Sequence, residues 1–278
     1  MPIYKVPYTK YFEFTHFQEK KEDFDKYKEL CREPINQLIE KYNIKSKKIL
    51  SIGSSFGFEE YWFYKNGCQL IFLDYDESNF LESYLKKIPT MENEDMLTYI
   101  IDDAKNYKKY INEKFDVIYF SGFSPSELRN SEICSKNLNI KSRFLRKITR
   151  KFDNTYLIKN WPNNQKPFID LVIKIIDDLL KNTGLFIYQS YASDVYAMDP
   201  NYLKQIKNQL NSSKIQLLSV YYVPGYPSYH LIIGFKGTHP EGLEFIKKIH
   251  KNPEIQKIHG RGLPNVKNFK GVNKVYSF

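Results

Sequence analysis

The 278-residue chain has only three cysteines and no long uncharged apolar run. Cys31, Cys68 and Cys134 are scattered and odd in number, so they suit neither a disulfide framework nor a zinc site, and we expect no metal. A membrane-spanning helix needs about 18 or more apolar residues, and no such run is present. No N-terminal signal peptide is recognisable either. We therefore expect a soluble, cytoplasmic protein without membrane contact.

Arginine is also scarce, although the chain is basic, with a formal net charge of +10. Four of its six arginines, Arg129, Arg143, Arg146 and Arg150, fall in one short stretch. Lysine dominates elsewhere, which is typical of a solvated surface, whereas base and phosphate recognition favours arginine. The sequence has no zinc knuckle, RNP-like aromatic strand or Gly-rich arm. We expect a small, anionic acceptor as partner, and nucleic acid remains the alternative.

The most informative stretch present is Lys48–Ser78, which reads as strand, turn, helix and strand. A short apolar run stops at Gly53, and the turn continues to Gly57, so the backbone can approach a ligand there. A helical segment follows, with Gly67 where a C-terminal glycine belongs. The next apolar run ends at Asp74, and an acid at that place can bind both hydroxyls of a ribose. The unit predicts binding of an adenosine-containing ligand.

The turn differs from a dinucleotide fingerprint, which needs three glycines against a pyrophosphate. Ser55 occupies the middle glycine position, and no Gly-Lys-Ser/Thr follows to cradle phosphates. The pattern resembles motif I of the class I S-adenosylmethionine-dependent methyltransferases, whose ligand has no phosphate. The resemblance implies that S-adenosylmethionine is the co-substrate.

The resemblance extends from about residue 45 to residue 236 and implies an α/β fold with a doubly wound, mostly parallel sheet of seven strands. The other expected strands are 97–104, 115–122, 185–191, 215–223 and 229–236, with a helix over 166–182 and the last two strands antiparallel. Asp103 is the better candidate for the adenine amino group, and Asp102 is its alternative. The donor-binding positions implied by the family are Gly53, Ser54, Ser55, Gly57, Asp74, Tyr75, Asp102, Asp103, Ala104 and Ser121.

Two departures from the family pattern affect the site. The family commonly has Asp or Glu two residues before the first glycine, where this chain has Ser51. That acid organises the amino-acid end of the donor, so Glu59, Glu60 or backbone carbonyls near Ser121 must substitute for it. The segment Ser121–Pro125 also lacks the Asn/Asp-Pro-Pro-Tyr/Phe signature of enzymes that methylate nucleobase or glutamine amides.

Segments outside the core pattern supply the expected substrate side. Residues 1–44 form a predicted aromatic cap, residues 126–165 an insertion above the ligand crevice, and residues 237–278 a basic extension. Tyr8, Arg143 and Trp161 are the candidate substrate contacts. His16 and Tyr11 are the candidate catalytic groups.

These observations predict a methyltransferase acting on a small molecule. One alternative is transfer of the 3-amino-3-carboxypropyl group of the same donor, as in a nicotianamine-synthase-like enzyme, because the serine at position 51 alters the amino-acid end of the site. The second alternative is an RNA-directed methyltransferase or an RNA-binding accessory subunit. The acceptor, the catalytic base, the oligomeric state and the pathway do not follow from the residues.

Overall fold

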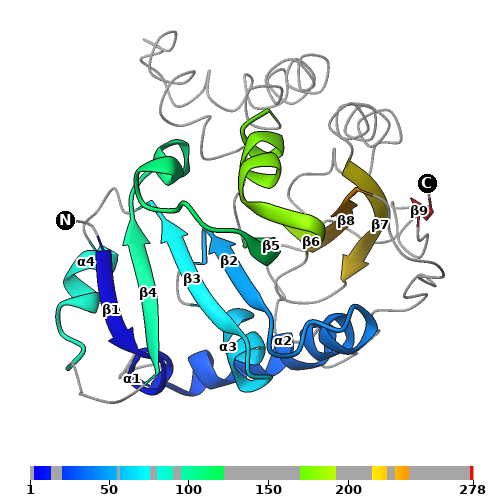
Figure 1. The fold of residues 1–278 in the computed structure, drawn as a ribbon. Coiled ribbons are helices and arrows are strands. Elements are labelled where there is room, and N and C mark those ends of the chain that lie inside the picture. The colour runs from blue at the N-terminus through cyan, green and yellow to red at the C-terminus, as the bar shows by residue number, and fades with distance from the viewer. Residues whose placement is uncertain are drawn as a thin grey trace, which may run out of the picture.

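The computed structural model describes residues 3–13, 21–54, 57–75, 80–89, 95–121, 170–191, 215–223, 229–237 and 276–277. Their strands form one sheet in the order β1-β4-β3-β2-β5-β6-β8-β7-β9 (Figure 1). The strands are β1 Ile3–Pro7, β2 Lys48–Ile52, β3 Gln69–Asp74, β4 Met96–Ile101, β5 Phe115–Phe120, β6 Leu180–Tyr191, β7 Ile215–Val223, β8 Tyr229–Lys236 and β9 Tyr276–Ser277.

The centre of the sheet is parallel. Strand β2 pairs in parallel with β3 on one side and β5 on the other, and β4 and β6 extend this parallel set outward. Strands β8 and β7 then follow in antiparallel orientation. This confirms the predicted doubly wound, mostly parallel α/β fold with a terminal antiparallel pair. Two edge strands that the sequence did not indicate, β1 and β9, pair antiparallel with β4 and β7.

Helices cover both faces of the sheet. Successive strand residues point to opposite sides, so apolar strand residues contribute to a layer on each face. Ile49 of β2 belongs to one apolar cluster, and its neighbour Leu50 belongs to the other. The first cluster includes residues of α1 Tyr8–Glu13, α2 Lys21–Lys41, α3 Glu60–Lys65 and α4 Phe80–Leu85. The second includes η2 Ala104–Lys109 and a helix over residues 170–179. Within the described ranges, no helix has the length and apolar character needed to cross a membrane.

The end of α3 shows how the sequence sets the start of β3. Gly67 has φ +77°, in the left-handed region that glycine tolerates. Its N–H donates to the carbonyl of Tyr64 at 2.8 Å, and the Cys68 N–H donates to the carbonyl of Phe63 at 3.1 Å. This pair of bonds is the Schellman motif, so the prediction that the helix ends before Gly67 is confirmed.

The later helix ends sooner than predicted. It stops at residue 179 rather than 182, because Leu180 already pairs with Phe115 of β5. The register then shifts, so that Leu185 is opposite Val117. The Nζ of Lys236 donates to the carbonyls of Ile176 at 3.3 Å and Leu180 at 3.4 Å. A cation at this helix end is favourable, and it comes from β8, which local sequence cannot reveal.

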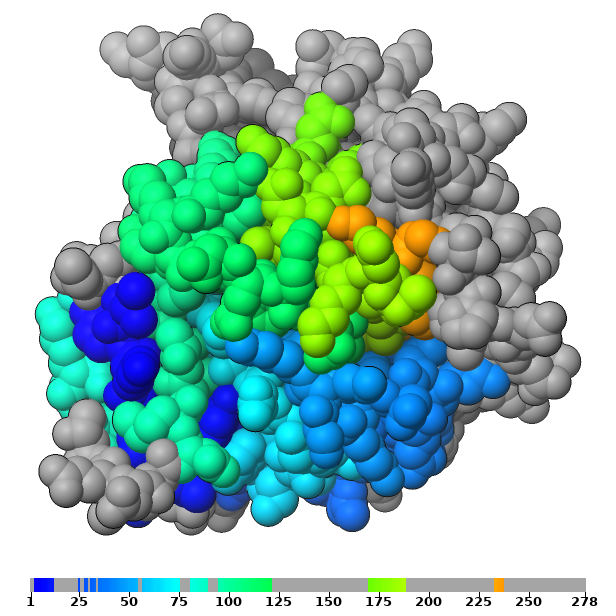
Figure 2. All heavy atoms as spheres, in the orientation of Figure 1, coloured from blue at the N-terminus to red at the C-terminus, as the bar shows by residue number. Residues whose placement is uncertain are grey.

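The N-terminal residues 3–13 pack directly on the sheet. Figure 2 shows the dark blue N-terminal residues beside the green residues of β4 at one edge of the molecule. The Tyr8 hydroxyl donates to the Leu70 carbonyl at 3.0 Å and accepts from the Leu70 N–H at 2.6 Å. Because β3 pairs with β4 only from Ile71 onward, this hydroxyl takes the place of a neighbouring strand at Leu70.

Replacing Tyr8 with Phe should therefore destabilise the fold. The change leaves two buried backbone groups of Leu70 without their partner, at a cost of about 1–3 kcal/mol in the free energy of unfolding. Urea denaturation followed by circular dichroism measures this difference. Tyr75→Phe is the matched control, since the Tyr75 side chain is exposed. Equal stability of the two variants would show that Tyr8 does not secure this edge.

Candidate functional site

The predicted donor-binding residues meet at the carboxyl edge of the sheet. Ile52 of β2 lies opposite Leu73 of β3 and Phe120 of β5. The residues that follow these strand positions, Gly53, Asp74 and Ser121, therefore lie side by side. The Gly53 N–H donates to the Leu73 carbonyl at 2.9 Å, and the Ser121 N–H donates to the Ile52 carbonyl at 2.8 Å.

This edge is also where the strand order reverses. From β2 the chain proceeds to β3 and β4 on one side, and later to β5 and β6 on the other. The crevice at such a switch point, outside the carboxyl ends of the strands, is where open α/β sheets bind ligands. The topology therefore supports the same position for the site as the motif in the sequence.

The turn after β2 needs glycine for reasons of backbone and packing. Gly53 has φ +77° and Gly57 has φ +70°, both in the left-handed region. A Cβ atom at Gly57 would lie 3.2 Å from ring atoms of Phe12 and Phe72. Gly57 is thus required by the fold itself, whether or not a ligand approaches. Ser54 is buried in the turn, and Ser55 lies outside the described residues.

Asp74 is held at the end of β3 by two donors. Its Oδ1 accepts from the Tyr75 N–H at 2.8 Å, and its Oδ2 accepts from the Tyr99 hydroxyl at 3.3 Å. Burial, and then the charge of Asp74, raise the pKa of Tyr99 well above its usual value, so the hydroxyl stays protonated and keeps donating. The side chain of Tyr75 is 63% exposed beside this carboxylate.

Tyr99 was missed by sequence reasoning. It lies opposite Phe72 in the parallel register, on the face of the sheet from which its hydroxyl reaches Asp74. A tyrosine near the end of one strand, next to a strand that ends in an acid, is a weak sequence signal for a contact between the two side chains. It becomes specific only when the register and the face are known.

The structure separates the roles of the two neighbouring acids after β4. Asp102 accepts from the Asp103 N–H at 2.7 Å, from Asn106 Nδ2 at 2.8 Å and from the Tyr110 hydroxyl at 2.5 Å. The bond from Tyr110 is the main reason why the pKa of Asp102 is lowered. Asp103 caps η2 by accepting from the Lys105 N–H at 2.9 Å, and its side chain is 44% exposed. Asp102 thus accepts three hydrogen bonds, whereas Asp103 caps the helix with one, and the buried Ala104 begins η2 directly after it.

A carboxyl group lies beside position 51, although the residue there is serine. The Ser51 hydroxyl donates to Oε1 of Glu60 at 2.5 Å, and both residues are completely buried. Ser121, the residue after β5, also hydrogen-bonds the Glu60 carboxyl group. Among the described residues, the second carboxyl oxygen, Oε2, has no hydrogen-bond partner. Helix α3 thus brings a buried acid beside the strand position that carries serine.

The surroundings of Glu60 favour its protonated form. Burial is the largest cause, the negative charge of Glu59 is the next, and together they raise the pKa of Glu60 to about 8. The hydrogen bonds from Ser51 and Ser121 act in the opposite direction but are weaker. Glu59 is itself buried and accepts a hydrogen bond from the thiol of Cys31, whose pKa burial also raises.

Two of the expected substrate and catalytic residues, Tyr8 and Tyr11, lie in the described ranges, and of these two Tyr11 approaches this edge. Tyr8 binds Leu70, which precedes Asp74 by four strand residues or about 13 Å. Tyr11 is buried, its hydroxyl bonds Tyr99, and burial raises its pKa so far that it stays protonated at neutral pH. The remaining three candidates, His16, Arg143 and Trp161, lie outside the described residues, and their roles stay predictions.

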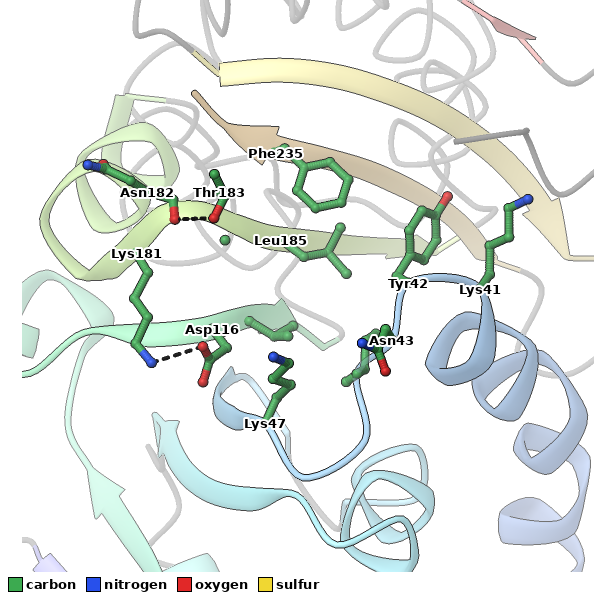
Figure 3. Close-up of a pocket in the computed structure, with 13 residues that line it drawn as sticks. Lys41, Tyr42, Asn43, Lys47, Asp116, Lys181, Asn182, Thr183, Leu185 and Phe235 are labelled. Atoms are coloured by element: carbon green, nitrogen blue, oxygen red, sulfur yellow. Dashed lines mark hydrogen bonds and ion pairs between the residues drawn. The ribbon is translucent and has the colours of Figure 1, made fainter. Parts of the chain in front are cut away.

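A separate pocket of about 360 Å³ lies at the opposite, amino end of the parallel strands (Figure 3). Its lining includes Lys41 at the end of α2, Lys47 directly before β2, and Asp116 at the start of β5. The Asp116 carboxylate binds Lys181 at 2.9 Å and accepts from the Lys48 N–H at 3.0 Å. Asp116 in this pocket is therefore already paired, and none of the predicted donor-binding residues lines the pocket. No cluster of three or more potential metal ligands occurs in the described part of the chain.

No protein-family model matches the sequence, and no curated protein does. Solved structures similar to the chain include a fibrillarin pre-rRNA processing protein of Methanococcus jannaschii, 17% identical with a TM-score of 0.45, over 70% of this chain and 69% of that one. A fibrillarin of Aeropyrum pernix with natively bound S-adenosylmethionine is 12% identical with a TM-score of 0.44, over 68% of this chain and 66% of that one.

A third similar structure is the 1,6-didemethyltoxoflavin-N1-methyltransferase of Burkholderia thailandensis, with its toxoflavin precursor and S-adenosylhomocysteine bound. It is 12% identical with a TM-score of 0.43, and the match covers 75% of this chain and 79% of that one. The chain thus spans just under two thirds of the Aeropyrum protein and more of the other two. Likeness at this level says nothing about the ligand or the reaction of this chain, so both remain to be argued from its own residues.

Glu60 should make the stability of the fold depend on pH. Between its ordinary value of 4.5 and its folded pKa of about 8, the folded state holds a proton that the unfolded state has lost. The free energy of unfolding therefore falls as the pH rises through this range. In Glu60→Gln the side chain is neutral at every pH, so this contribution is absent. Urea denaturation at pH 5 and pH 8 should show a smaller decrease in the free energy of unfolding for the variant than for the wild type. Equal decreases in the two proteins would contradict the environment assigned to Glu60.

Proposed function

We propose that the chain binds S-adenosylmethionine at the carboxyl edge of the sheet and transfers its methyl group to a small-molecule acceptor. The observation that carries the proposal is the meeting of Gly53, Asp74, Asp103 and Ser121 along one edge, at the switch point between β2 and β5. Sequence motifs far apart in the chain converge there, as an adenosine site requires.

The available groups fit the parts of this donor. Asp74, oriented by Tyr99, has a carboxylate suited to the two ribose hydroxyls. Asp103 offers a partly exposed acceptor for the adenine amino group. Gly53 permits close approach of the backbone, and the buried Glu60 carboxyl lies near the strand ends where the amino-acid end would bind.

The donor carries an activated methyl group on a sulfonium. When the acceptor attacks the methyl carbon, the bond between this carbon and the sulfur breaks, and the sulfur keeps the electron pair. The protein needs mainly to align the acceptor with this methyl carbon and to exclude water. Some acceptors also lose a proton, for which a base is needed. Among the described residues Tyr11 is unsuited to that task because its hydroxyl stays protonated. The base is therefore expected from the acceptor side of the site.

The small-molecule acceptor is preferred on the composition of the chain. The positive charge is mainly lysine, and the sequence offers no recognisable RNA-binding module. A steep loss of RNA affinity with rising salt would favour the RNA-directed alternative instead.

Transfer of the 3-amino-3-carboxypropyl group is a second candidate, favoured by one observation. The acid that would organise the amino-acid end is absent from position 51, and the Glu60 carboxyl approaches from the helix instead. A changed hold on that end of the donor could expose the other sulfonium carbon to the acceptor. The two candidates differ in product, since methyl transfer leaves S-adenosylhomocysteine and the alternative leaves methylthioadenosine.

Isothermal titration calorimetry with S-adenosylmethionine, S-adenosylhomocysteine and methylthioadenosine tests the proposal. Binding of the donor and S-adenosylhomocysteine supports methyl transfer, and preference for methylthioadenosine supports the alternative. Absence of binding by all three would overturn the assignment of the site.

Asp74→Asn should weaken donor binding by about tenfold or more, because a hydrogen bond to a charged acceptor contributes roughly 1.5–3 kcal/mol. The matched control is Glu29→Gln on the exposed surface of α2, which should bind the donor like the wild type. Calorimetry measures both affinities, and thermal unfolding checks that both variants fold. Unchanged affinity in Asp74→Asn would show that this carboxylate does not contact the ribose.

A further inference from the structure

A buried carboxyl group with an unused oxygen lies beneath the proposed crevice. Glu60 is completely buried, and among the described residues its Oε2 has no hydrogen-bond partner. No ion pair to Glu60 occurs within the described ranges either. Since most buried side-chain polar atoms have partners, an unused oxygen of this kind points to a group that the ligand provides.

Glu60 lies at the end of the sheet where a ligand would bind. The carboxyl group contacts Ser51, the residue before the last of β2, and Ser121, the residue after β5. The turn at Gly53 follows two residues after Ser51. A ligand group placed between Gly53 and Ser121 therefore faces the Glu60 carboxyl group.

The groups around Glu60 select a cation. The other acid at this point is the buried Glu59 at the start of the same helix. Tyr11 from α1 and Cys31 from α2 also lie near Glu60, and burial raises the pKa of both so that they remain uncharged at neutral pH. A phosphate or carboxylate here would meet only uncharged or acidic neighbours among these groups, whereas an ammonium group would be stabilised.

We propose that Glu60 is the counter-charge for the α-ammonium group of the donor, replacing the acid that the family commonly has at the position of Ser51. This inference rests on the proposed function and makes it more specific. It restricts the ligand to adenosine carriers that end in an amine or amino acid. The acid has moved from the strand to the helix, while the carboxyl group itself remains beside the end of β2.

Binding of the ammonium group is then linked to release of a proton. With a pKa of about 8, Glu60 is mostly protonated at pH 7 when no cation is nearby. An adjacent ammonium favours the ionised carboxylate, so the carboxyl proton passes to the solvent as the ion pair forms. Donor affinity should therefore rise with pH up to about pH 8.

Calorimetry on the full chain and on Glu60→Gln tests the proposal with three probes. S-adenosylhomocysteine carries the amino acid, decarboxylated S-adenosylmethionine carries the amine alone, and methylthioadenosine carries neither. Glu60→Gln should weaken the binding of the first two probes by about tenfold or more, as expected for loss of one charged contact. Its affinity for methylthioadenosine should stay within about twofold of the wild-type value. Glutamine has the shape of the protonated acid, so the variant keeps the size and polarity of the buried side chain.

Two further variants separate charge from packing. Glu59→Gln removes the neighbouring acid and should change the affinity for S-adenosylhomocysteine by less than about threefold. Ser51→Asp in the Glu60→Gln background returns a carboxyl group to the usual family position and should recover most of the lost affinity. A loss in Glu59→Gln as large as in Glu60→Gln, or no recovery in the double variant, would overturn the specific role of Glu60.

Proton release is measured by repeating the titration at pH 7 in phosphate and in Tris, whose ionisation enthalpies differ. The wild type should release up to about one proton with S-adenosylhomocysteine, and Glu60→Gln none, as expected for a group titrating near pH 8. If wild-type protein binds methylthioadenosine and S-adenosylhomocysteine equally and without proton release, the inference fails while the adenosine site stands. If it binds none of the probes, the proposed function fails as well.

Discussion

Parallel pairing on both sides of β2 is the constraint on which the rest of the structure depends. Because β3 and β5 share the direction of β2, all three strands end at one edge and leave their last backbone groups facing one crevice. The residues at these strand ends, Gly53, Asp74 and Ser121, are brought together by the parallel pairing and its backbone hydrogen bonds. Parallel sheets are covered on both faces, which explains why two apolar clusters are needed to hold this edge in place.

Polar groups inside the first apolar cluster connect the N-terminal segment to the site. The Tyr84 hydroxyl donates to the Tyr11 carbonyl at 2.9 Å, the Tyr11 hydroxyl bonds Tyr99, and Tyr99 donates to Asp74. Each tyrosine remains protonated because burial raises its pKa. A network of buried, satisfied hydrogen bonds of this kind fixes geometry. The ribose-binding acid of the proposed site is thus positioned by residues that precede β2 as well as by its own strand.

Glu60 differs from this network, because among the described residues one of its carboxyl oxygens has no hydrogen-bond partner. A buried carboxyl group is costly when charged, so burial and the neighbouring charge of Glu59 keep Glu60 neutral, although Ser51 and Ser121 hydrogen-bond it. The same features that lower its charge in the free protein make it responsive to a cation. Because this carboxyl group comes from the helix, the strand itself carries only serine at that point.

The order of the apolar runs and the glycines between them were sufficient to predict the doubly wound sheet and the end of α3, because these features depend on residues close together in the chain. The roles of Asp74 and Asp103 stay predictions. Local sequence did not reveal the edge strand β1, the early end of the helix at residue 179, or the contact of Tyr99 with Asp74. Each of these is set by a partner from a distant segment. The sequence by itself determined the order of the strands and the glycine turn after β2, because these depend on local residues. It placed the ends of β4 and β5 too late and the start of β6 too late, because pairing with neighbouring strands sets them. Only the tertiary structure decided which face each side chain occupies, and hence that Glu60 stands beside Ser51.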